Sequence, residues 1–258
     1  MRWPELNDAE AQVRKSVHSE LQTFDHISAQ LAEIAYHAPR LPIRSSDPSS
    51  PSTSPFQKNL TFLFLGRTIN QLRSLWLLTI NGYTTEAGAI CASIIEHAAV
   101  VAEIARDPKK AEQLDKAITA AHSKDEFDVK FLPWKYKELF DDIETARGLN
   151  EKLISKLYSY ACKKKHPSTI DELMTSRSGG DLTAFPDGST EDLSNKKFVL
   201  CVAHYLILIA LEAISTHFNW DEGDEYFQQY VQATKVAQGA VNAEMQKLVI
   251  ERLGPGTL

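Results

Sequence analysis

His166 is the first side chain in this sequence whose type and setting could do chemistry. It follows a run of three lysines that starts at Lys163, and Tyr160 stands six residues before it. A neutral imidazole near cations could act as a general base or as a hydrogen-bond partner, with a charge state tuned near neutral pH. The alternative is a histidine that only fixes the turn at the end of a helix. The candidate catalytic residues are therefore His166, Lys163 and Tyr160.

A second candidate site centres on Glu96 and His97. They lie in a segment that we expect to be a helix covered on several sides, and a buried carboxylate needs a partner. Arg67 or Arg73 on the preceding predicted helix could supply that partner. Polar side chains flank these residues along both helices, namely Asn70, Gln71 and Ser74 on the first and Glu86 and Ser93 on the second. Two facing polar stripes would line a small-molecule pocket, or they would form a structural network that fixes the register of a helical bundle.

Lysines gather on one face of the predicted helix at residues 151–165. Lys152, Lys156 and Lys163 fall opposite an apolar stripe, so a local cationic strip is expected in an acidic protein. This basic patch could hold phosphate or an acidic partner. It could equally be a solvated face whose last-turn lysines complement the negative end of the helix dipole.

The elements that must position these residues are helical throughout. Apolar residues recur at three- and four-residue steps, and no strand pattern or internal repeat is convincing. Capping residues, prolines and glycines divide the pattern into predicted helices at 4–38, 57–81, 84–107, 108–121, 133–147, 151–165, 196–218 and 222–253. We therefore predict an all-α helical bundle with a long N-terminal amphipathic helix.

Two long loops interrupt this pattern. Residues 39–56 are rich in proline and serine, and residues 176–195 are rich in glycine and other turn formers. The predicted organisation is an N-terminal helix at 1–38, a linker at 39–56 and a helical bundle domain at 57–258.

Composition bounds the class of protein. The chain has 258 residues, of which 43% are hydrophobic and 24% charged, and its net charge of −6 gives no general attraction to nucleic acid. The three cysteines form no CxxC pair, and the N-terminus lacks the pattern of a signal peptide. The most apolar stretch, 198–211, is too short for a bilayer span and is expected to be a buried central helix. These features predict a cytoplasmic protein with no membrane partner.

Common catalytic and metal-binding signatures are missing. Di-metal helical bundles need Glu-x-x-His pairs on two helices, and this sequence contains none. It also has no GxSxG, HExxH or phosphate-loop motif. We expect no metal and no cofactor, and we expect His204, alone in an apolar helix, to be a hydrogen-bonded core histidine.

Several short motifs resemble an uncharacterised bacterial all-helical family known only as a domain of unknown function. The resemblance covers roughly residues 60–218. Its motifs are Leu75-Trp76-Leu77-Leu78, Asn81-Gly82-Tyr83, Glu86-Ala87-Gly88-Ala89, Ile94-Ile95-Glu96-His97, Arg106-Asp107-Pro108, Tyr158-Ser159-Tyr160 and His166-Pro167-Ser168. It implies a helical bundle in a bacterial protein, sometimes encoded near mobile or defence genes, and implies no activity.

This chain departs from that family at two positions. Ala92 stands where the family usually has an arginine four residues before Glu96, and Cys162 stands where a serine usually precedes the His-Pro pair by four residues. If those side chains form a polar site in relatives, this protein has lost part of it.

The stretch from Lys163 to His166 also resembles helical ribonucleases of the HEPN type, which are all-α and usually dimeric. They cleave RNA without metal, with an arginine followed by a histidine at a helix end. Here lysines replace the arginine, and lysine lacks its bidentate fork.

These observations leave two functional hypotheses. The first is a non-enzymatic binding or regulatory module with the pocket of Arg67, Arg73, Glu96 and His97 and with a protein partner or a second copy of itself. The alternative is a metal-independent ribonuclease or toxin component that uses His166, with RNA as its partner. Whether the protein is an enzyme stays open, and the absence of a complete catalytic set favours binding.

Overall fold

The computed structural model describes residues 3–42, 55–122, 132–149, 152–165, 177–178, 181–182 and 190–253. Within these ranges the chain forms eight α-helices, one short 3₁₀ helix and a pair of two-residue strands. The predicted all-α class is confirmed. The helices are α1 (Trp3–His37), α2 (Pro55–Ile80), α3 (Thr84–Arg106), α4 (Pro108–His122), α5 (Tyr136–Arg147), α6 (Leu153–Lys165), α8 (Thr190–His217) and α9 (Glu225–Leu253).

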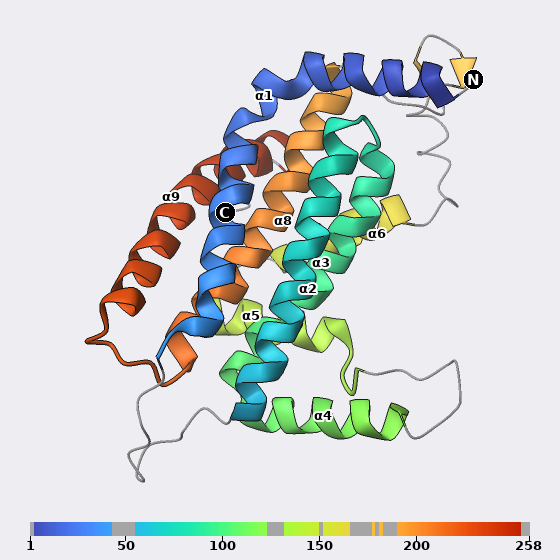
Figure 1. Ribbon diagram of the computed structural model, residues 1–258. Helices are drawn as coiled ribbons and strands as arrows, with labels where there is room; N and C mark the ends of the chain where they lie inside the picture. The colour runs from blue at the N-terminus through green and yellow to red at the C-terminus, as the bar shows by residue number, and fades with distance from the viewer. Residues whose placement is uncertain are drawn as a thin grey trace.

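Helices α3 and α8 form the centre of the bundle (Figure 1). Every residue from 198 to 211 on α8 is buried, which confirms the predicted central helix. On α3 the run 98–105 is buried as well. A helix that is apolar on all sides is stable only when neighbours cover all sides, and here α2, α6, α1 and α9 surround the central pair.

The long helix α1 packs on the bundle. Its buried side chains follow the predicted three- and four-residue steps, for example at Leu21, Phe24 and Leu31, and they contact α2, α8 and α9. In Figure 1 the first part of α1 crosses the end of the bundle where α2 turns into α3. There Arg14 Nη2 donates a hydrogen bond of 2.7 Å to Asn81 Oδ1. The N-terminal helix therefore shares one core with the helices that follow.

Two glycines end helices in backbone conformations that other residues rarely adopt. Gly82, in the turn between α2 and α3, has φ of 91°, and Gly148, directly after α5, has φ of 62°. The amide of Leu149 then donates to the carbonyl of Glu144 at 2.9 Å, the long hydrogen bond of a Schellman motif. Glycine has no Cβ to oppose this conformation, so α5 and α6 meet at a fixed angle.

The segment predicted as a loop at 176–195 is shorter than expected. Helix α8 begins at Thr190, five residues before the end of the predicted loop. Strands β1 (Arg177–Ser178) and β2 (Asp181–Leu182) pair antiparallel in the same predicted loop. Most of the linker at 39–56 lies outside the described residues, although α2 begins at Pro55 within it.

His204 is the buried core histidine that the sequence predicts. Its Nε2 atom lies 2.7 Å from Ser28 Oγ on α1, and its ring stacks on Phe24 with centroids 6.2 Å apart. Complete burial lowers the pKa of His204 to about 3, so the imidazole is neutral at neutral pH. The hydrogen bond joins α1 to the central helix α8.

Candidate functional site

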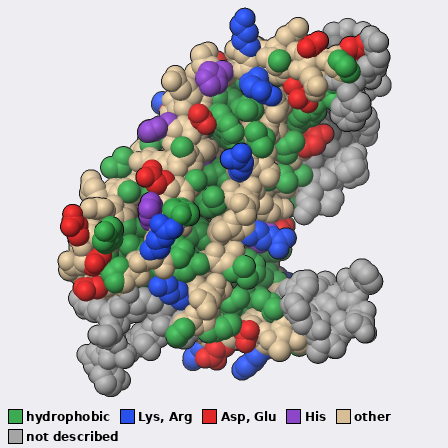
Figure 2. Space-filling model, viewed as in Figure 1, with side chains coloured by type: hydrophobic (Ala, Val, Ile, Leu, Met, Phe, Trp, Pro, Cys, Tyr) green, Lys and Arg blue, Asp and Glu red, His purple; other side chains and the backbone are tan. Residues whose placement is uncertain are grey.

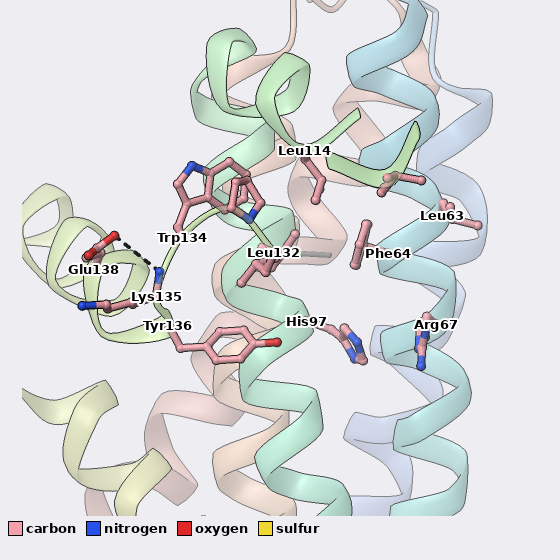
Figure 3. A pocket seen from close by; sticks show the side chains of 13 residues that line it. Leu63, Phe64, Arg67, His97, Leu114, Leu132, Trp134, Lys135, Tyr136 and Glu138 are labelled. Atoms are coloured by element: carbon pink, nitrogen blue, oxygen red, sulfur yellow. Dashed lines mark hydrogen bonds between the residues drawn. The ribbon is translucent and has the colours of Figure 1, made fainter. Parts of the chain in front are cut away.

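One candidate site is a pocket of about 1030 Å³ between α2, α3, α4 and the segment that leads into α5. A volume of this size accommodates a drug-sized molecule. Figure 3 shows side chains from all four segments converging on it. The lining residues are Leu63, Phe64, Arg67, His97, Val100, Leu114, Ile118, Leu132, Pro133, Trp134, Lys135, Tyr136 and Glu138.

One end of the pocket is apolar. Leu63 and Phe64 reach it from α2, Leu114 reaches it from α4, and Leu132 and Trp134 close it from the segment before α5 (Figure 3). The indole Nε1 of Trp134 donates a hydrogen bond of 2.8 Å to Gln113 Oε1 on α4. This bond fixes the orientation of the ring, so the apolar wall exists before any ligand arrives.

The other end is polar and is built by Arg67, His97 and Tyr136. Arg67 lies one helical turn after Phe64 on α2, and His97 lies one turn before Val100 on α3. Each helix therefore presents an apolar and a polar residue to the same pocket. In Figure 3 the hydroxyl of Tyr136 points toward His97, and His97 lies beside Arg67.

His97 is held as a neutral imidazole. Its Nδ1 atom lies 2.8 Å from Gln71 Oε1 on α2. Burial and then the charge of Arg67 lower the pKa of His97, while Glu96 acts in the opposite direction. Because the amide oxygen of Gln71 only accepts, Nδ1 carries the proton and Nε2 is the accepting nitrogen. Gln71 and His97 also confirm that the two predicted polar stripes face each other.

Glu96 is bound by a tyrosine hydroxyl and not by an arginine. Tyr158 on α6 donates to Glu96 Oε1 at 2.6 Å. Burial, and then Glu96, raise the pKa of Tyr136 to about 12. The same two causes raise the pKa of Tyr158. Both tyrosines are therefore protonated at neutral pH, and the Glu96–Tyr158 hydrogen bond ties α3 to α6.

Two predicted members of the site, Arg73 and Glu96, are not among the residues that line this pocket. Arg73 is exposed on α2. Six residues separate it from Arg67, which places it about 120° away around the helix axis. Arg67 is the arginine that reaches the site. Cys162 and Ala92, the two departures from the resembled family, lie one helical turn from Tyr158 and Glu96.

The predicted lysine strip is described in part. Lys156 is exposed on α6, whereas Leu153, Ile154, Leu157 and Ala161 are buried, as predicted. Lys152 is also exposed, but it precedes α6, which begins at Leu153, and its φ is 56°. Lys163 lies in the last turn of α6, but its side chain and all of His166 are outside the described residues.

Tyr160, the third predicted catalytic residue, has structural partners. Its hydroxyl donates to Asn195 Oδ1 at 3.1 Å, and its ring packs edge-on against Phe198 with centroids 4.8 Å apart. The ribonuclease hypothesis stays a prediction.

Sequence reasoning missed the tyrosine and tryptophan that complete the pocket. Trp134 lies in an irregular connection and Tyr136 is the first residue of α5, so helical periodicity does not indicate which way these two side chains point. One signal was present, since the stretch 132–136 places two aromatic residues beside a proline between two helices. Aromatic side chains in such connections often line binding sites.

A second pocket of about 450 Å³ lies between α3, α5, α8 and α9. The charged side chains in and beside it bind each other. Buried Glu103 pairs with Arg106 at 2.7 Å and with Lys110 at 2.6 Å, and Arg147 pairs with Glu212. Paired charges of this kind hold helices together and leave less for a ligand to bind.

The outer surface carries no extended patch of one charge on the face that Figure 2 shows. Lys and Arg side chains are interspersed with Asp and Glu, and hydrophobic side chains run between them. Among the described residues, no three His, Cys, Asp or Glu side chains gather to hold a metal ion.

Helices α3 and α8 are long and apolar enough to cross a membrane. However, 72% of the most apolar 18-residue stretch of α3 is buried inside the protein, and 83% of the corresponding stretch of α8 is buried. Such burial is typical of core helices, so these two helices are weak evidence for a membrane protein.

No protein-family model, curated protein or solved structure matches this chain.

Proposed function

We propose that the protein is a cytosolic, non-enzymatic binding module that holds a small molecule in the pocket between α2, α3, α4 and the start of α5. The single observation that carries this proposal is the composition of the pocket, whose apolar end lies opposite the polar end of Arg67, His97 and Tyr136. Most small-molecule sites combine apolar walls with a few fixed polar groups in this way.

The hydrogen bonds around the polar end support binding over catalysis. Gln71 holds His97, and Tyr158 holds Glu96. These contacts fix the positions of the polar groups before a ligand binds, which lowers the entropic cost of binding.

The pocket also supports a regulatory role. Its lining comes from three helices and from the segment before α5, so a ligand would contact all four at once. A ligand that binds only the folded state stabilises it, by about 2.7 kcal/mol at 100 times its dissociation constant. We propose that ligand occupancy steadies α4 and the start of α5 against the rest of the bundle.

Fluorescence titration with N-phenyl-1-naphthylamine tests the proposal. This neutral, apolar dye brightens in apolar surroundings, and a ligand of its size is expected to bind with a dissociation constant on the order of 0.1 mM. We expect saturable binding to one site with energy transfer from Trp134. The Trp134→Phe variant should lose most of that energy transfer.

A matched pair of leucines on α2 provides the control. Leu63 lines the pocket and is 67% exposed, whereas Leu77 is 45% exposed and lies outside the pocket. Because both are exposed, either can be changed to glutamate without unfolding the protein. Leu63→Glu should weaken dye binding several-fold, and Leu77→Glu should leave it unchanged. Equal effects of the two changes would contradict the proposal.

A further inference from the structure

The polar end of the pocket indicates which class of ligand it takes. We infer that the ligand is an aromatic or otherwise apolar molecule with a single negative charge, such as a carboxylate, which Arg67 binds. This inference rests on the proposed function, because it concerns the same pocket.

Arg67 is a cation without an acidic partner. Within the described part of the chain, no carboxylate lies within ion-pair distance of its guanidinium, although Arg106, Lys110 and Arg147 all have such partners. A guanidinium presents several N–H donors in a planar fork that matches a carboxylate. An anionic group on the ligand would complete these contacts at the polar end.

The acids near the pocket are already engaged. Glu96 accepts a hydrogen bond from Tyr158. Glu138 lines the opposite side, where its Oε2 atom accepts from the backbone amide of Lys135 at 3.4 Å. In Figure 3 Glu138 is turned toward Lys135 and away from Arg67. Neither carboxylate therefore neutralises Arg67 directly.

The charges that face the site favour one negative charge over two. His97 is neutral because burial and Arg67 lower its pKa, which leaves Arg67 as the cation of the polar end. Lys135 is exposed at the rim. The Glu96 carboxylate behind Tyr136 would repel a second negative charge. A carboxylate or sulfonate therefore fits this end better than a phosphate dianion.

The apolar end favours a flat body on the same ligand. Phe64 and Trp134 both line the pocket, and Phe64 also packs at 5.9 Å from the ring of His97. Aromatic side chains favour aromatic partners in stacked or edge-on contact. A molecule that reaches from Trp134 to Arg67 would use both ends of the pocket.

Two dyes that share an aromatic body test the inference. 1-Anilinonaphthalene-8-sulfonate carries one negative charge, and N-phenyl-1-naphthylamine is its counterpart without the sulfonate. We expect the wild-type protein to bind the sulfonate at least about tenfold more tightly, the strength of one charge-assisted hydrogen-bonded contact. Inorganic phosphate at millimolar concentration should not displace it.

Arg67→Gln is the deciding variant, and Arg73→Gln is its matched control. Both arginines are exposed on α2, but only Arg67 lines the pocket. Arg67→Gln should weaken binding of the sulfonate about tenfold and change binding of the neutral dye less than twofold. Arg73→Gln should change neither. A thermal melt of each variant confirms that it folds.

The outcomes separate the inference from the proposed function. If neither dye binds, the proposed function fails. If both dyes bind wild type equally and Arg67→Gln changes nothing, the pocket stands and the anion preference is wrong. If inorganic phosphate displaces the sulfonate, the choice of a single charge over a phosphate is overturned.

Discussion

Replacing Glu96 by glutamine should destabilise the protein, because this carboxylate joins two helices. Glu96 on α3 accepts a hydrogen bond from Tyr158 on α6 at 2.6 Å. The substitution keeps the shape of the side chain and removes its charge. A hydrogen bond to a charged group contributes about 1.5–3 kcal/mol, against about 0.5–1.5 kcal/mol for a neutral one.

One such bond predicts a loss of about 1 kcal/mol in the free energy of unfolding. Urea unfolding followed by circular dichroism at 222 nm measures this loss, and the melting temperature should fall by about 2–4 °C. Arg73→Ala is the control, because Arg73 is exposed and outside the pocket. Its effect should stay within about 0.5 kcal/mol.

A double-mutant cycle with Tyr158→Phe separates the hydrogen bond from other effects of the change. If Glu96 and Tyr158 act through their mutual bond, the two losses will not add, and the coupling will be about 1 kcal/mol. A loss for Glu96→Gln no larger than that for Arg73→Ala would refute the assignment of Glu96 as the link between these helices.

Three further predictions follow from particular residues. Tyr136 should ionise near pH 12, so the stability that its raised pKa contributes is present below about pH 10 and is lost as the pH rises toward 12. The difference in absorbance at 295 nm between wild type and Tyr136→Phe measures this ionisation. A titration midpoint near pH 10 would contradict the prediction. His204 has its pKa lowered to about 3, so the unfolded chain binds the proton more readily and stability falls as the pH drops from about 6.5 toward 3. His204→Phe should reduce that pH dependence, and an unchanged profile would refute its origin in His204. Gly82→Ala should cost about 1 kcal/mol in urea unfolding, because φ is 91° there, and no loss would show that the turn relaxes freely.

Helical periodicity was enough to predict the fold class. The apolar stripes at Leu21, Phe24 and Leu31 on α1 and at Leu153 and Leu157 on α6 are buried as expected. Periodicity identifies one face of a helix, and burial of that face follows directly. For the same reason, the lone His204 in an apolar helix was correctly expected in the core.

Periodicity predicted only part of the candidate site, because it identifies the face of one helix and not the contacts between helices. A stripe that includes Arg67 and Gln71 faces α3, but Arg73 is on another side of the helix, and only its angular position distinguishes it from Arg67. The partner of Glu96 was expected to be an arginine, whereas Tyr158 from α6 hydrogen-bonds to it instead. Long-range contacts of this kind depend on how helices cross, which spacing within one helix does not specify.

The ribonuclease hypothesis has its own test. Purified protein incubated with RNA and a chelator should show no more cleavage than the His166→Ala variant if the chain is a binding module. Chelator-resistant cleavage that His166→Ala abolishes would favour the alternative.

The indole N–H resonances of the tryptophans test the central claim most directly. Trp134 lines the pocket, whereas Trp220 is buried elsewhere and donates to the carbonyl of Ile214 at 2.8 Å. On addition of 1-anilinonaphthalene-8-sulfonate to ¹⁵N-labelled protein, the Trp134 resonance should shift saturably while that of Trp220 stays in place. An unmoved Trp134 resonance under conditions where the dye binds would contradict the pocket as the binding site.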